Sequence, residues 1–176
     1  GQKLAGLEKE GIFVAEKVSV AVAEIKNPVS FWADLSRKLK SKTVIVKPQN
    51  DGCSSGIVRL FSSEDLKKYL EIVKSGAHFI PKGTFKNQNG IIEMPLHRMD
   101  RLLFEKFIET DSIRVKGNRL KWKKKDGFIE VTVAVLERGG RYHSLCSSLT
   151  VAEGEVLSVE EKFQGGTGVN ISPPPE

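Results

Sequence analysis

The segment Thr43–Leu60, TVIVKPQNDGCSSGIVRL, contains the pattern that decides the fold. Its start, "TVIVKP", is apolar or β-branched and ends in a Lys-Pro pair, which predicts a buried strand that stops at Pro48. A second strand, "GIVRLF", follows a loop of small residues. The stem of Lys47 therefore lies beside the core, while its ammonium can reach an anion.

The loop between these strands, "NDGCSSG", suits a bound anion. It offers glycine backbone for close approach, N–H groups that can form an anion nest, and the hydroxyls of Ser54 and Ser55. It is not a Walker A loop, because neither GKS nor GKT follows the glycines. A solvated hairpin turn beside a surface lysine explains the same residues, so this stretch alone leaves both interpretations open.

The composition is that of an ordinary globular protein and restricts the class of function. The 176 residues suffice for one domain or two small subdomains. Lys and Arg number 28 against 22 Asp and Glu, so the net charge of 28 − 22 = +6 favours anionic ligands. No apolar run approaches the roughly 20 residues that span a bilayer. The opening residues lack a secretory pattern, and the two cysteines lack metal-site or CxxC spacing, which favours a reducing compartment.

Helix and strand signals alternate along the chain. We expect a short helix in "KLAGLEKEG", ended by Gly11, and helices in "NPVSFWADLSRKLKSK" and in "SSEDLKKYLEIVKSG", the last capped by Ser63 and ended by Gly76. Strands are expected in "IFVAEKVSVAV" and "RLLFEKFI", a hairpin at Asn89-Gly90, and a β-meander from Ile113 to Val151. The pattern predicts an α+β fold with mainly antiparallel strands.

Two acidic residues lie in apolar strands. In "LLFEKFIE" and "FIEVTVAVL" the apolar residues could wall an adenine slot, with backbone groups of Glu105–Ile108 for the base edge and a carboxylate for the ribose hydroxyls. An exposed charge at a strand edge is the commoner explanation of each glutamate alone.

Four segments together resemble a known family. "VIVKPQNDGCSSGIVRL", "LLFEKFIE", "FIEVTVAVLERGG" and "EEKFQGGTGVNISPPPE" occur in the order found in D-alanine–D-alanine ligases, in the central ATP-grasp domain and its flexible active-site loop. The resemblance implies a fragment of an α+β ATP-grasp fold, with antiparallel sheets and flanking helices. The implied parts are a lead-in helix and strand region (1–40), a small ATP-grasp subdomain with the Lys-Pro strand and phosphate loop (41–109), a basic inserted hairpin (110–128), and the start of the C-terminal ATP-grasp subdomain with the active-site loop (129–176).

The resemblance also implies catalytic residues and a reaction. Lys47 would contact the α- and β-phosphates of ATP, and Lys162 would approach the γ-phosphate from the closing loop. The full-length enzyme would phosphorylate one D-alanine carboxylate to an acyl phosphate, which the amine of a second D-alanine attacks, for peptidoglycan precursor synthesis. Its Mg²⁺ ligands would lie beyond residue 176. We therefore expect weak nucleotide binding by this fragment and no ligation.

The implied ATP-binding residues come from several segments. They are Lys3 and Lys47 near the phosphates, Gly52, Cys53 and Ser54 in the covering loop, Glu105, Lys106, Phe107 and Ile108 along the adenine, and Glu130 at the ribose. Cys53 stands where the family usually has serine, and Phe163 stands where a tyrosine usually helps to close the loop. The long insertions resemble plant, plastid-type relatives, which implies cytoplasm or plastid stroma. A homodimer of the full-length enzyme is compatible with the family, and no membrane partner is expected.

Two other functions fit parts of the sequence. A nucleic-acid-binding module could use the basic segment 114–125, with Trp122 stacking on bases, although a solvated charged hairpin explains that segment better. Another ATP-grasp carboxylate–amine ligase, with a different acceptor, would share all the residues above. The three histidines lack metal-ligand spacing, and Cys146 is expected to be a small core residue.

Overall fold

The computed structural model describes residues 6–116, 119–125, 127–151 and 169–173. The chain separates into two units, Gly1–Ile108 and Glu109–Glu176. Among the described residues, no helix combines the length and the apolar character that crossing a membrane requires.

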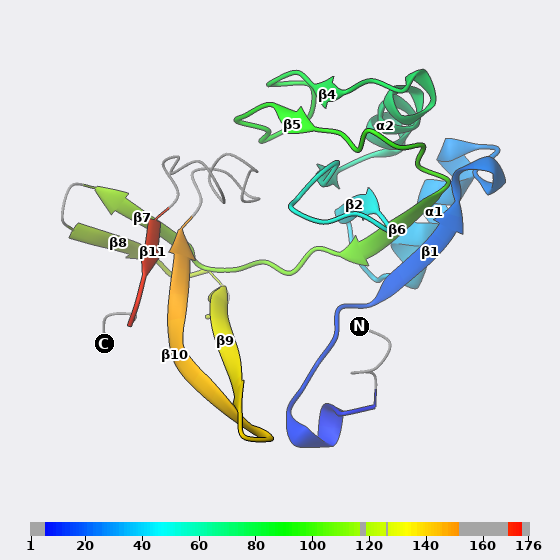
Figure 1. Ribbon diagram of the computed structural model, residues 1–176. Coiled ribbons are helices and arrows are strands. Elements are labelled where there is room, and N and C mark those ends of the chain that lie inside the picture. Colours follow the sequence, from blue (N-terminus) through cyan, green and yellow to red (C-terminus); the bar gives the residue numbers. More distant parts are fainter. Residues whose placement is uncertain (1–5, 117–118, 126, 152–168, 174–176) are drawn as a thin grey trace. The chain divides into compact units, whose positions relative to one another are not determined.

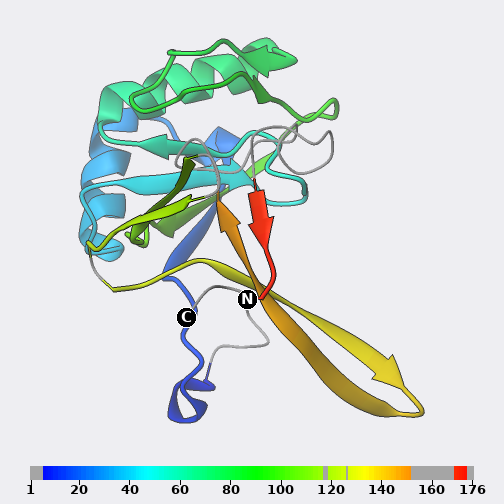
Figure 2. The same ribbon diagram turned by 90° about the vertical axis from the view of Figure 1, so that its left-hand side faces the viewer.

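The first unit is built on a four-stranded antiparallel sheet with the order β1-β6-β2-β3 (Figure 1). The strands are β1 (Lys17–Ala21), β6 (Arg101–Lys106), β2 (Val44–Pro48) and β3 (Val58–Leu60). Helices α1 (Pro28–Lys38) and α2 (Ser63–Ser75) pack against each other and against one face of the sheet, as both ribbon views show (Figure 2). The α+β expectation with antiparallel sheets and flanking helices is confirmed at this level.

Side chains alternate strictly between the two faces of this sheet. The even-numbered strand residues from Val44 to Phe104 form the apolar face and are buried with Leu35 and Leu39 of α1 and with Leu66, Tyr69 and Leu70 of α2. The Phe31 and Phe104 rings, whose centroids are 5.3 Å apart, join α1 to the sheet. The odd-numbered residues point to the other face. The period-two pattern of "TVIVKP" therefore sets which side of the sheet carries Lys47.

The helix ends follow local capping rules, with one correction. The Asn27 side chain accepts hydrogen bonds from the Val29 and Ser30 amides at the start of α1, directly before Pro28. For α2 the cap is Ser62, whose hydroxyl accepts from the Asp65 amide at 3.2 Å, so the prediction of Ser63 was wrong by one residue. At its C-terminal end α2 is capped by Gly76, as predicted. The backbone of Gly76 is in the left-handed region.

The opening segment differs from the expected short α-helix. The described part contains a single 3-10 turn at Glu8–Glu10, which ends at Gly11. The segment buries none of its residues, and a short helix without a buried face is marginal in water. The predicted glycine stop is correct, whereas the described part of the segment, from Gly6 onward, forms a single 3-10 turn and no α-helix.

A short hairpin lies beside α2. Strands β4 (Phe79–Ile80) and β5 (Ile92–Glu93) pair antiparallel, so the expected hairpin with short strands is present. Its connection spans residues 81–91 and its turns lie before Asn89-Gly90, which corrects the expected position of the turn. The Gly56 amide donates to the Glu93 carbonyl at 2.8 Å, and the buried Tyr69 hydroxyl donates to the Gly56 carbonyl at 2.7 Å. The loop after β2 is thereby joined to both the hairpin and α2.

The described part of the second unit contains two hairpins. Strands β7 (Ser112–Lys116) and β8 (Arg119–Lys123) form the first, within the basic segment. Strands β9 (Val131–Arg138) and β10 (Arg141–Val151) form the second, and β11 (Val169–Ile171) pairs with β10. The β-meander is therefore two hairpins. The side chains of β9 are exposed, and so is Cys146 on β10, which corrects the expectation of a buried thiol.

A buried carboxylate organises the first hairpin. Asp111 is 7% exposed, and its carboxylate accepts hydrogen bonds from the Trp122 indole at 2.8 Å and from the Lys125 and Gly127 amides at 2.8 and 2.9 Å. Its own amide donates to the Phe128 carbonyl at 2.8 Å. Because buried carboxylates require such donors, Asp111 fixes the chain that follows β8.

The Tyr69 hydroxyl is expected to contribute measurably to the stability of the first unit. Burial raises the pKa of Tyr69 well above its ordinary value, so the hydroxyl stays protonated and donates to Gly56. Tyr69→Phe removes this donor from a buried carbonyl and should lower the free energy of unfolding by about 1–2 kcal/mol in urea denaturation. Tyr142→Phe, on an exposed side chain, should change it little. Equal losses in both variants would contradict this role.

Candidate functional site

The sheet face opposite the helices is cationic. The odd-numbered residues of β1, β6, β2 and β3, all of which the structure describes, include four cations and one carboxylate; these are Lys17, Lys47, Arg59, Arg101 and Glu105. Lys17 pairs across strands with Glu105, and Arg59 pairs with Ile45 in the same row of the sheet. A face with three excess positive charges favours an anionic ligand.

Two residues predicted for the site meet on this face. Lys47 lies opposite Leu103 and diagonal to Glu105, and its Nζ is 2.5 Å from Glu105 Oε2. The two side chains are 31% and 22% exposed, so the ion pair is shielded from water over most of its surface. Lys47 is thus oriented by Glu105, and an arriving anion would compete with that carboxylate for the ammonium.

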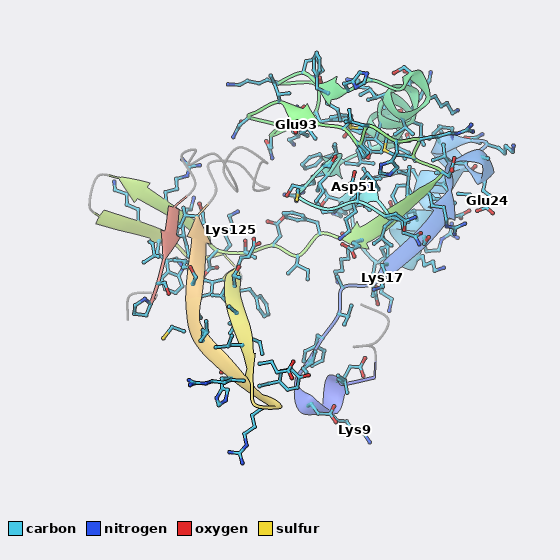
Figure 3. All side chains as sticks on the ribbon, viewed as in Figure 1. Lys9, Lys17, Glu24, Asp51, Glu93 and Lys125 are labelled. Carbon is cyan, nitrogen blue, oxygen red and sulfur yellow. The ribbon has the colours of Figure 1, made fainter. Side chains whose placement is uncertain are left out.

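The loop after β2 has a compact left-handed conformation. Cys53, Ser54 and Gly56 have φ angles of 55°, 63° and 64°. A Cβ on Gly56 would lie 3.0 Å from Pro48 Cγ, a tight contact, and the positive φ independently favours glycine at this position. Figure 3 labels Asp51 near the start of the loop and Glu93 on β5. The loop is therefore a folded turn anchored to the core.

Some of the loop amides that we expected to bind an anion have partners within the protein. The Gly52 amide donates to the Asp51 carboxylate at 2.7 Å, and the Ser55 amide donates to the Gly52 carbonyl at 3.0 Å. The Gly56 amide is bonded to β5, as described above. The Cys53 amide, by contrast, makes no hydrogen bond with any of the described residues, and the Cys53 side chain is exposed. An anion at this loop would meet the Cys53 end first.

The segment expected along an adenine contains a contact that was not expected from the sequence. Glu105 and Lys106 end β6, and Phe107 and Ile108 follow it. The Arg59 guanidinium lies 3.5 Å from the centroid of the Phe107 ring and donates from Nη2 to the Thr43 hydroxyl at 3.1 Å. Cation–π stacking of this kind orders the ring. The alternation of side chains in "IVRL" could have predicted that Arg59 lies on the same face of the sheet as Lys47.

The remaining predicted residues lie in the second unit or outside the described residues. Glu130 belongs to the second unit, directly before β9, and its side chain is exposed. Lys3, Lys162 and Phe163 lie outside the described residues. Within the described ranges, no group of three His, Cys, Asp or Glu side chains could hold a metal ion.

Removal of the Glu105 charge should strengthen anion binding. In Glu105→Gln the Lys47 ammonium keeps its position but loses the competing carboxylate, so inorganic tripolyphosphate should bind about three-fold or more tightly in calorimetric titration. Asp34→Asn, in an exposed ion pair with Arg37 on α1, is the matched control and should not change the affinity. An unchanged affinity in Glu105→Gln would show that Lys47 does not face the anion. A gain in affinity cannot result from misfolding.

Comparison with protein-family models gives no match to the sequence, and comparison with curated proteins gives none either. Solved structures do share the fold. The crystal structure of D-alanyl-alanine synthetase A from Vibrio cholerae O1 biovar eltor str. N16961 superposes with a TM-score of 0.50 and 13% sequence identity. The match covers 97% of this chain and 38% of that protein, so this chain spans less than half of its length. At this identity the likeness establishes a similar fold alone.

Proposed function

We propose that the chain is the ATP-binding part of an ATP-grasp carboxylate–amine ligase of the D-alanine–D-alanine ligase type. The observation that carries the proposal is the half-buried Lys47 on a cationic sheet face, between a folded small-residue loop and the segment expected along the adenine. The likeness in fold to a D-alanyl-alanine synthetase supports the same reaction class. Lys47 at the phosphates, the small-residue loop over them and the adenine segment Glu105–Ile108 were expected from the family resemblance in the sequence.

In this function the first unit would bind and orient the nucleotide. Transfer of a phosphoryl group needs positive groups near the oxygens on which charge develops. Lys47 would provide one such charge, and its stem, fixed by β2, would keep the ammonium in position. Backbone groups of Glu105–Ile108 would hold the base edge, with Phe107 ordered by Arg59.

We propose D-alanine as the acceptor substrate on the basis of the C-terminal sequence pattern. The "QGGT…SPP" pattern favours D-alanine over other carboxylate–amine ligase substrates, and most of that segment lies outside the described residues. ATP and D-alanine would be the substrates of the full-length protein, and a dimer of that protein is compatible with the family. Lys162 and Glu130 keep their expected roles toward the γ-phosphate and the ribose within this proposal.

The geometry of the basic hairpin supports nucleic-acid binding less well than the first unit supports ATP binding. Cross-strand pairing puts Arg114 opposite Lys121, on one face of the two-stranded ribbon. Trp122 is adjacent to Lys121 in β8, so its ring lies on the opposite face, where its indole N–H donates to Asp111. Base stacking on Trp122 and phosphate contacts by these cations would therefore involve different faces of the ribbon.

Nucleotide binding should depend on Lys47. ATP without magnesium, titrated into labelled protein, should shift the amide signals of Lys47, Gly52–Ser54 and Glu105–Ile108, and Lys47→Met should abolish these shifts because the phosphates lose their cation. Lys67→Met, on the exposed side of α2, serves as the control and should leave them intact. Shifts confined to 114–125, in the wild type and in both variants, would refute ATP binding at this sheet.

The two exposed thiols provide a second test with an internal control. Cys53 lies in the loop expected over the phosphates, and Cys146 lies on β10 of the second unit. ATP should slow alkylation of Cys53 by iodoacetamide several-fold, because the bound nucleotide covers the loop, without slowing alkylation of Cys146. Peptide mass spectrometry measures both rates in one sample. Identical Cys53 rates with and without ATP would argue against this position for the nucleotide.

A further inference from the structure

The cationic sheet face carries a second positive group close to Lys47. Arg101 begins β6, two residues before Leu103, which is the cross-strand partner of Lys47. Diagonal neighbours of this kind are about 7–8 Å apart on the same face of a sheet. The backbone also connects Arg101 to the loop, because the Gln49 amide donates to the Arg101 carbonyl at 3.2 Å. Arg101 is therefore adjacent both to Lys47 and to the start of the loop.

Neutral oxygens hold the Arg101 guanidinium in place. Its Nε donates to the Ser19 hydroxyl at 3.4 Å and to the Gln49 side-chain oxygen at 3.3 Å, and its Nη2 donates to the Ser19 hydroxyl at 3.2 Å. The Ser19 hydroxyl in turn donates to the Gln49 side-chain oxygen. Three residues from β1, β6 and the loop thus form one closed polar network.

This network orients the guanidinium without neutralising it. Arg101 makes no ion pair with any described residue, and its described hydrogen bonds use Nε and Nη2 and leave Nη1 with two N–H donors. The contrast with Lys47, which is paired with Glu105, lies within one sheet face. An oriented arginine whose charge has no carboxylate partner is suited to bind a phosphoryl oxygen.

We infer that Arg101 is a second phosphate-binding cation, which contacts a different phosphoryl group of the same polyphosphate from the one held by Lys47. The inference rests on the proposed nucleotide site and extends it. Two cations at diagonal positions can share a chain of several phosphates, whereas a monophosphate reaches one of them. Arg101 thereby selects nucleoside triphosphates over monophosphates.

The test compares ligands that differ in phosphate number. Binding of ATP, inorganic tripolyphosphate and AMP is measured by calorimetry without magnesium, in the wild type, Arg101→Gln and Lys47→Met. Arg101→Gln should weaken ATP and tripolyphosphate roughly ten-fold and AMP far less. Lys47→Met should weaken all three ligands. Arg98→Gln is the control, because Arg98 is exposed, lies three residues earlier in the chain and pairs with Asp100 at 3.1 Å.

The outcomes separate this inference from the proposed function. If Lys47→Met loses ATP while Arg101→Gln binds ATP and tripolyphosphate as the wild type does, the nucleotide site stands and the role of Arg101 is refuted. An equal loss of AMP and ATP in Arg101→Gln would also refute it, since that pattern indicates general damage to the site. If the wild type binds none of the ligands, the proposed function and the inference fail together. Arg101→Lys keeps the charge without the planar fork and should give an intermediate loss.

Discussion

The alternation of side chains across the four-stranded sheet is the constraint on which the first unit depends. Val44, Val46 and Pro48 face the helices, so Ile45 and Lys47 must face the other way. A shift of one residue in the pairing of β2 would exchange the side chains of the two faces. Lys47 would then be buried in the core, and Val44 and Val46 would be exposed. Core packing therefore determines the positions of the charges on the opposite face.

Much of this fold was predictable because the deciding signals are local. The strand before Lys-Pro, the Asn-Pro start of α1 and the glycine end of α2 depend on neighbouring residues alone. The cap of α2 differed by one residue because Ser62 and Ser63 are both good caps and only the backbone angles distinguish them. Cys146 was misjudged because a free cysteine is usually a small buried residue, whereas its side chain on β10 is exposed.

The site was predictable residue by residue, whereas its contacts were not. Lys47 and Glu105 could each be singled out from the sequence, but their ion pair requires that β6 lies directly beside β2 in one register. The same holds for Arg101, whose partners come from β1 and from the residue after β2. The alternation pattern of a strand predicts which face of the sheet each side chain points to. It does not predict which residues of distant strands become its neighbours.

The anchored loop between β2 and β3 has a thermodynamic consequence for any ligand. Left-handed angles at Cys53 and Ser54 are unfavourable for non-glycine residues, and the bonds from Gly56 to β5 and α2 hold the chain in them. The conformational entropy of this turn is accordingly lost when the protein folds, so ligand binding does not require a further loss. Binding here should have the kinetics of a rigid surface, with an association rate set by diffusion and charge attraction and independent of loop rearrangement.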